Sequence, residues 1–279
     1  MPSSLTGVRA TSPVESDWIA RARAHLERGE WDAGMAAYRG AIEVDPESRI
    51  TPRGIELVRV LGRGRLSVRF AARSGDGDFE VEPIAPHLLT RARMLAVETR
   101  CHRLSMVSHP DVVRSQVIRH GHHAMLVTPI VGSKPFWEAR AEDGFDAERL
   151  FHVVDRVGDQ LQALHAAGVV HGRLAMDLVA VAWPKVHVSG NVLEPLLSAD
   201  PTCQPPEGED VRALGQLLAD GLEGRSRKMT TVGLVYRPLI ELLAMSSSPL
   251  ASRASLGRFR AALEVIRFDP GALELLQSA

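Results

Sequence analysis

The segment from Leu164 to Val181, LHAAGVVHGRLAMDLVAV, constrains the fold of this chain more than any other stretch. A helical pattern of apolar residues leads into it, and a pair of short strand-like runs lies at its end, near Val179–Val188. The sequence therefore predicts a helix, a loop and a strand pair in this order, with Gly168 and His171 in the loop.

The spacing of this segment resembles the catalytic loop of bacterial Ser/Thr protein kinases, which reads LHxxGxxHRDLKPxNxxV. In that family the Asp accepts the substrate hydroxyl proton and the Asn holds magnesium. Here Arg173 stands at the Asp position, Ala175 at the Lys position and Leu178 at the Asn position. A frame that is kept while its reactive groups are replaced resembles a pseudokinase. The residues that match the frame are Leu164, His165, Gly168, Val170, His171, Leu174 and Val179.

Charge and composition exclude several classes of function. The chain has 33 basic and 34 acidic residues, so no global field favours nucleic acid or an acidic membrane surface. Its two cysteines are too few for a disulfide framework. We find no signal-peptide core and no run long enough for membrane insertion, and expect a soluble, cytoplasmic protein.

The first 50 residues divide into two parts. Residues 1–13 are rich in Ser, Thr and Pro, and we expect them to be disordered. Residues 14–50 read as two helices with a turn at Gly29, and Trp18, Trp31 and Tyr38 fall at the spacing of a tetratricopeptide repeat. A single hairpin cannot bury both of its faces. It therefore packs on the next domain as a cap, on another copy of the chain, or on a partner protein.

The rest of the chain predicts an α+β fold with the two lobes of a protein kinase. Residues 54–130 alternate short strand-like runs with turns around one helical segment, as in a small β-rich N-lobe. Residues 131–279 are mainly helical, as in a kinase C-lobe. The junction between the lobes is expected near residues 129–133.

Two positions of the N-lobe bear on phosphate binding. The turn Gly62-Arg63-Gly64 resembles a glycine-rich loop, although a plain β-hairpin turn explains its glycines equally well. On the following strand Glu82 occupies the position of the Lys that holds phosphate in kinases. A carboxylate there repels phosphate, which argues against ordinary ATP binding.

The helix after this strand supplies a Glu that pairs with the Lys in active kinases. Counting back from His109-Pro110 places Arg100 at that position, with Glu98 as the alternative. The sequence thus predicts a charge-reversed bridge between Glu82 and Arg100. The alternative is that both side chains are solvated.

The C-lobe motifs divide into those lost and those retained. Val188 replaces the magnesium-binding Asp of the DFG motif, and with Leu178 this removes both side-chain ligands of the metal. His171 resembles a packing residue of the family, so we assign it a structural role. Asp210 is expected to accept backbone N–H bonds from the loop around residues 171–173. Glu207 and Arg253 resemble the retained ion pair of the C-lobe.

These motifs predict a catalytically inactive pseudokinase without cofactor or metal, which acts as a protein-interaction, scaffold or allosteric regulatory module. The hairpin, through Trp18, Trp31 and Tyr38, is the expected contact with protein partners or with a second copy of the chain. One alternative is a nucleotide or small-molecule sensor that uses the vestigial cleft. Another is an enzyme with non-kinase transfer chemistry, which would need metal ligands that we do not find.

Overall fold

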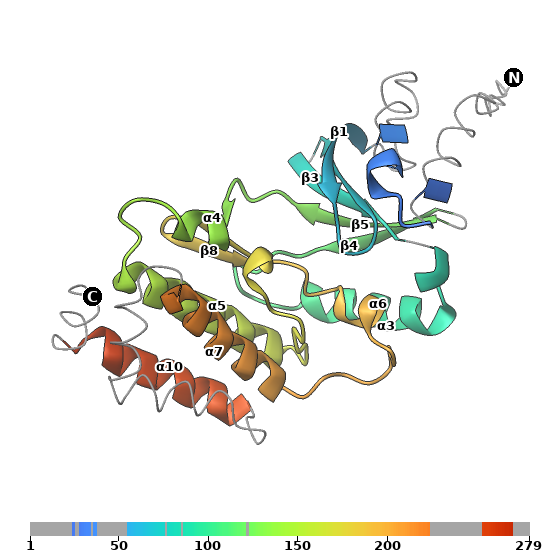
Figure 1. The fold of residues 1–279 in the computed structure, drawn as a ribbon. Coiled ribbons are helices and arrows are strands. Elements are labelled where there is room, and N and C mark those ends of the chain that lie inside the picture. Colours follow the sequence, from blue (N-terminus) through green and yellow to red (C-terminus); the bar gives the residue numbers. More distant parts are fainter. Residues whose placement is uncertain are drawn as a thin grey trace, which may run out of the picture. The chain divides into compact units, whose positions relative to one another are not determined.

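The chain forms two compact units, shown in Figure 1. The computed structural model describes residues 24–25, 28–34, 36–37, 55–75, 77–84, 86–120, 123–223 and 253–269. The first unit comprises residues 1–86 and 118–129, and the second comprises residues 87–117 and 130–279. The break at residue 129 coincides with the junction expected from the sequence.

The first unit is built on a five-stranded sheet. Its strands lie in the order β1-β2-β3-β5-β4, and the β1–β2, β2–β3 and β3–β5 pairs are antiparallel. Over the first five residues of β2, side chains alternate between buried and half-buried, because successive residues of a strand point to opposite faces. The bounds are β1 (Glu56–Arg63), β2 (Val68–Ser74), β3 (Gly77–Pro83), β4 (Gln116–His120) and β5 (His123–Pro129).

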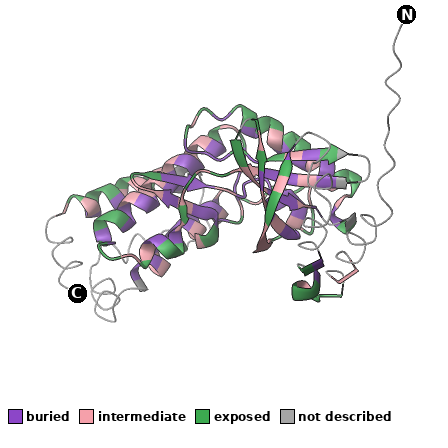
Figure 2. Ribbon diagram, turned by 90° about the horizontal axis from the view of Figure 1, so that it is seen from above, coloured by how far each residue is buried: buried purple, intermediate pink, exposed green. Residues whose placement is uncertain are grey.

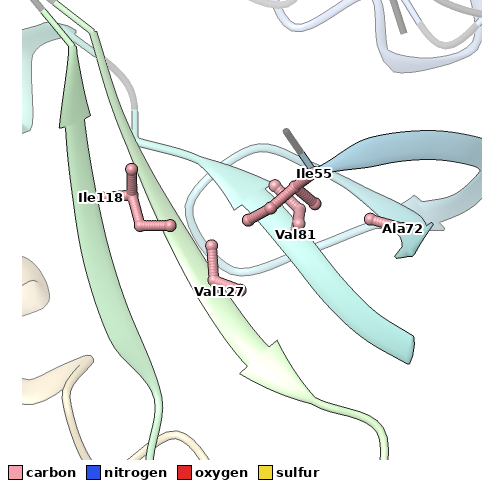
Figure 3. Packing of buried hydrophobic residues seen from close by; sticks show 5 residues of the cluster. All are labelled: Ile55, Ala72, Val81, Ile118 and Val127. Atoms are coloured by element: carbon pink, nitrogen blue, oxygen red, sulfur yellow. The ribbon is translucent and has the colours of Figure 1, made fainter. Parts of the chain in front are cut away.

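One face of this sheet carries an aliphatic core. Val81 of β3 lies opposite Val127 of β5, and both side chains are buried. Ala72 of β2 and Ile118 of β4 extend the cluster on either side, and Ile55 packs on it just before β1 (Figure 3). This core fixes the register of β3, and with it the position of Glu82, because a shift of one residue would reverse every side chain.

Helix α3 (Arg91–Ser105) belongs to the second unit, although the sequence assigned residues 54–130 to one lobe. The Thr90 hydroxyl caps its first turn by accepting a hydrogen bond from the Arg93 N–H at 3.3 Å. Met94, Val97 and Leu104 form its buried face, together with one charged residue, Arg100. The 3₁₀ turn η2 (Pro86–Leu88) precedes it.

The second unit is mainly helical. Helices α5, α7 and α10 pack against one another, and their facing sides are buried (Figures 1 and 2). A small antiparallel sheet of order β6-β7-β8 completes the unit. The helices are α4 (Phe136–Arg140), α5 (Ala147–Ala166), α6 (Glu194–Leu197), α7 (Gly208–Glu223) and α10 (Arg253–Arg267), and the remaining elements are β6 (Lys134–Pro135), η3 (Met176–Leu178), β7 (Val179–Ala182) and β8 (Lys185–Val188).

The segment 164–181 joins these elements in the predicted order. Helix α5 ends at a turn where Gly168 has φ +70°, a conformation that glycine adopts without strain. The chain then passes through η3 into the β7–β8 pair. The expected helix, loop and strand pair are therefore confirmed, as is the α+β fold class.

The N-terminal region is described only in part. A turn at Arg28–Gly29 separates helical residues 24–25 from helical residues 31–34 and 36–37, which confirms the predicted turn. Gly29 has φ +77°, and the Glu30 N–H donates to the His25 carbonyl at 2.9 Å. Within the described ranges, no helix is both long and apolar enough to cross a membrane.

Candidate functional site

In the first unit, Glu82 lies beneath the glycine-rich turn between β1 and β2. Its side chain points from β3 to this turn and is 5% exposed. Its Oε1 accepts hydrogen bonds from the backbone N–H groups of Leu66, at 2.5 Å, and Ser67, at 2.7 Å. Burial raises the pKa of Glu82, and the two N–H groups oppose this rise. The residue at the Lys position of kinases thus places an oxygen, rather than an ammonium group, on the turn.

In the second unit, Arg100 of α3 is buried among backbone carbonyls. Its Nε donates to the Asn191 carbonyl, and its Nη2 donates to the carbonyls of Val170 and His171. Its Nη1 lies 3.9 Å from Oε2 of Glu194, whose side chain is also buried. Burial lowers the pKa of Arg100 to about 10, and the charge of Glu194 opposes this change.

The sequence paired Glu82 with Arg100, but each of the two has hydrogen-bond partners within its own unit. Glu82 binds amides of its own unit, and Arg100 binds carbonyls of its own unit and pairs with Glu194. The physical reason is that backbone groups within hydrogen-bond reach satisfy each buried charge locally. Of the two candidate helix positions, Arg100 is buried and Glu98 is exposed.

Asp210 holds the loop of the second unit in place. Its side chain is fully buried at the start of α7. Its Oδ2 accepts the His171 N–H at 2.8 Å, its Oδ1 accepts the Gly172 N–H at 2.7 Å, and His165 Nε2 lies 2.8 Å from Oδ2. Burial raises the pKa of Asp210, but the hydrogen bond from His165 and the loop amides outweigh it, so the net pKa is lowered. The predicted role of Asp210 is confirmed.

His171 is buried and hydrogen-bonded on both ring nitrogens. Nε2 lies 3.0 Å from the Ser189 carbonyl, and the Arg173 N–H donates to Nδ1. These contacts are those of a residue that fixes backbone, as predicted. Arg173 is exposed, and its guanidinium donates to the Leu197 carbonyl at 3.0 Å. The Arg173 side chain thus binds the end of α6.

Leu178 and Val188 are both part of the apolar interior. Val188 is fully buried in β8, opposite Val179, and its N–H donates to the Gln160 amide oxygen at 2.9 Å. Leu178 packs against Gly190, where an added Cβ would lie 2.7 Å from Leu178 Cδ2. Neither side chain has an oxygen for a hard cation. Among the described residues, no group of three His, Cys, Asp or Glu side chains is arranged to hold a metal ion.

The remaining predicted residues are only partly described. Glu207 Oε2 lies 3.9 Å from His165 Nδ1, but the Arg253 side chain, at the start of α10, is outside the described residues. Trp18 and Tyr38 are outside them as well. Trp31 is half-buried at the start of the helical segment that follows the turn.

Sequence reasoning missed two further arginines of α3. Arg103 Nη1 donates to the Gly168 carbonyl at 2.9 Å, and Arg93 Nη2 donates to the Ser198 carbonyl at 3.2 Å. With Arg100 they follow the i, i+7, i+10 spacing of one helix face. This spacing is visible in the sequence and indicates a basic face toward the loop. Their carbonyl partners, 65 and 105 residues further along the chain, are not marked by any motif.

Comparison with known proteins establishes the class of fold. No protein-family model matches the sequence, and neither does any curated protein. The chain has the two-lobed fold of protein kinase domains, a β-sheet lobe followed by a mainly helical one. The structure is similar to the crystal structure of the Mycobacterium tuberculosis PknI kinase domain, a cysteine-to-alanine variant, with a TM-score of 0.62 and 14% sequence identity. The match covers 78% of this chain and 97% of that chain.

Proposed function

We propose that this chain is a catalytically inactive kinase-like module that acts by binding other proteins. The observation that carries the proposal is the burial of Leu178 and Val188 in the core of the second unit. By the resemblance of their motifs, these positions hold the two magnesium ligands of an active kinase. Phosphoryl transfer depends on magnesium and on positioning of the phosphates, and aliphatic carbon supplies neither.

Two further positions support inactivity. Arg173 stands where the family has its base, and a guanidinium cannot accept a proton at neutral pH. Glu82 stands where the family has its phosphate-binding Lys, and its carboxylate is already bound to the turn amides. The groups that shape the loop, Asp210 and His171, are retained. The fold has therefore kept its architecture and lost its reactive groups, as expected of a module that presents a surface.

A phosphotransfer assay tests the catalytic part of this proposal. Purified full-length chain is incubated with γ-labelled ATP and either Mg²⁺ or Mn²⁺, and labelled protein and released phosphate are both measured. We expect no transfer above a heat-denatured control. Metal-dependent transfer above this control would contradict the proposal. Its loss in an Asp177→Asn variant would assign the chemistry to Asp177, the carboxylate of η3 that lies one residue before Leu178.

The interaction part is tested by comparing partners captured by the full chain and by a chain without residues 1–50. We expect cytoplasmic protein partners that depend on the N-terminal hairpin, and the same comparison by light scattering tests a homo-oligomer. Trp31→Ala is the milder variant, since Trp31 opens the helical segment after the turn. Recovery of the same partners after deletion would contradict the role of the hairpin.

A further inference from the structure

The turn between β1 and β2 contains two convergent donors. The N–H groups of the neighbouring residues Leu66 and Ser67 both point at a single oxygen, Glu82 Oε1. The Gly64 N–H closes the turn by donating to the Ser67 carbonyl at 2.7 Å. Consecutive N–H groups that converge on one point form an anion-binding concavity of the kind that also holds phosphate. Here the anion on these donors is a side chain of the same unit.

Gly64 supplies an independent sign that the turn is shaped around this carboxylate. Gly62 has φ +142°, a conformation that favours glycine, but the φ of Gly64 lies outside this region. Backbone conformation therefore does not explain Gly64. Space does, because a Cβ there would lie 2.0 Å from Glu82 Oε1 and 2.4 Å from Glu82 Cδ. The glycine leaves room for the Glu82 side chain.

Glu82 is not one half of a surface ion pair. Arg69 is the nearby cation, but its guanidinium pairs with Glu80, two residues before Glu82 on β3, at 3.3 Å. Glu82 itself is 5% exposed, and its Oε1 accepts hydrogen bonds from the two turn amides. A buried carboxylate is retained in such a place only when hydrogen bonds compensate for its lost hydration.

We propose that the turn Gly64–Ser67 is an oxyanion site occupied by the chain's own Glu82 carboxylate, and that an external phosphate group binds there only when this carboxylate is removed. The inference deepens the proposed function and rests on it, since it names the means by which phosphate is excluded. The ligand class is an oxyanion of the size of a phosphoryl group. The Glu82 carboxylate excludes an external phosphate in two ways: it fills the space next to the turn amides, and its negative charge repels the phosphate.

The test uses the full chain and a ligand-dependent shift of the melting temperature, confirmed by titration calorimetry. Inorganic phosphate, ATP in EDTA, and adenosine are added to the wild type, Glu82→Ala and Glu80→Ala. Glu80 is the matched control, because it is the half-exposed carboxylate two residues away on the same strand. We expect saturable stabilisation of Glu82→Ala by phosphate and by ATP, with affinity raised about tenfold or more. The melting temperatures of the wild type and of Glu80→Ala should not change with phosphate or ATP, and adenosine should not change the melting temperature of any variant.

Two outcomes would overturn the proposal. One is a folded Glu82→Ala chain that gains no affinity for phosphate, which would show that the turn is not an anion site. The other is a wild type that binds phosphate as tightly as the variant does, which would show that Glu82 does not occlude it. Neither outcome restores a metal ligand, so the phosphotransfer assay decides catalytic inactivity separately.

A second measurement decides the case in which Glu82→Ala does not fold. Amide signals of Leu66 and Ser67 are followed by NMR in the wild type, Glu82→Gln and Glu80→Gln. A charged acceptor strengthens a hydrogen bond, so we expect both amide protons to move upfield when Glu82 becomes a neutral amide. The same signals should hold their positions in Glu80→Gln. Unchanged signals in Glu82→Gln would contradict the proposed occupancy.

Discussion

Asp210 shows how one buried carboxylate can organise a loop. Its carboxylate joins the start of α7 to the N–H groups of His171 and Gly172 and to the ring of His165. Each of these partners is buried or half-buried, so water does not readily replace the lost hydrogen bonds if the carboxylate is removed. The loop geometry of the second unit therefore depends on this side chain.

We expect Asp210→Asn to lower the free energy of unfolding by about 3 kcal/mol. An Asn side chain has one acceptor oxygen, so it cannot accept the three hydrogen bonds that the buried carboxylate accepts from His165, His171 and Gly172. Denaturant titration with an unchanged m-value measures this loss. Glu209→Gln is the control: its partly exposed ion pair with Arg212 should change stability by no more than about 0.5 kcal/mol. A loss in Asp210→Asn as small as in the control would contradict the role of Asp210.

The same variant has a defined pH dependence. The pKa of Asp210 is lowered in the folded chain, so the unfolded chain binds the proton more readily. The stability that Asp210 contributes is therefore present above the unfolded pKa, which is about 3.9, and is lost as pH falls through the folded pKa. The difference in stability between wild type and Asp210→Asn should narrow on acidification.

At the scale of elements, α3 is fastened to the second unit by its arginines. The guanidinium groups of these residues donate to carbonyls of three separate loop segments, and Arg100 also lies beside Glu194, the first residue of α6. The three arginines are Arg93, Arg100 and Arg103. In this way the helix that would carry the Lys-binding Glu in an active kinase is held by its own unit.

Two double-mutant cycles test this attachment. Arg100→Ala combined with Glu194→Ala should show a coupling energy of about 0.5–3 kcal/mol, because the two side chains share a buried environment. Arg100→Ala combined with Glu82→Ala should be additive within about 0.5 kcal/mol, because their partners differ. Strong coupling in the second cycle, or its absence in the first, would contradict this assignment. Unfolding free energies from denaturant titration supply all the values.

At the scale of the whole molecule, the sequence predicted positions better than partners. The loop frame placed His171 correctly, and the motif at the start of α7 placed Asp210, because their contacts are with the loop backbone that these motifs define. Glu82 and Arg100, which the sequence either paired or left solvated, are both buried. The sequence did not predict the partners that each of them has within its own unit, since a motif aligns residues but does not state which way a side chain turns. Glu82 turns toward amides 15 and 16 residues back along the chain, and no spacing rule marks that contact.

The central proposal is that the chain holds no metal–nucleotide complex at Leu178 and Val188, the positions that match the magnesium ligands of kinases. Paramagnetic broadening by Mn²⁺ tests it most directly, with the methyl groups of Leu178 and Val188 labelled for NMR. In the presence of ATP and Mn²⁺ we expect these methyl signals to keep their intensities relative to an ATP and Mg²⁺ sample. The reason is that neither aliphatic side chain offers an oxygen ligand, so no Mn²⁺–ATP complex is expected to bind within broadening distance of them. Saturable broadening of both signals that requires ATP would contradict the proposal.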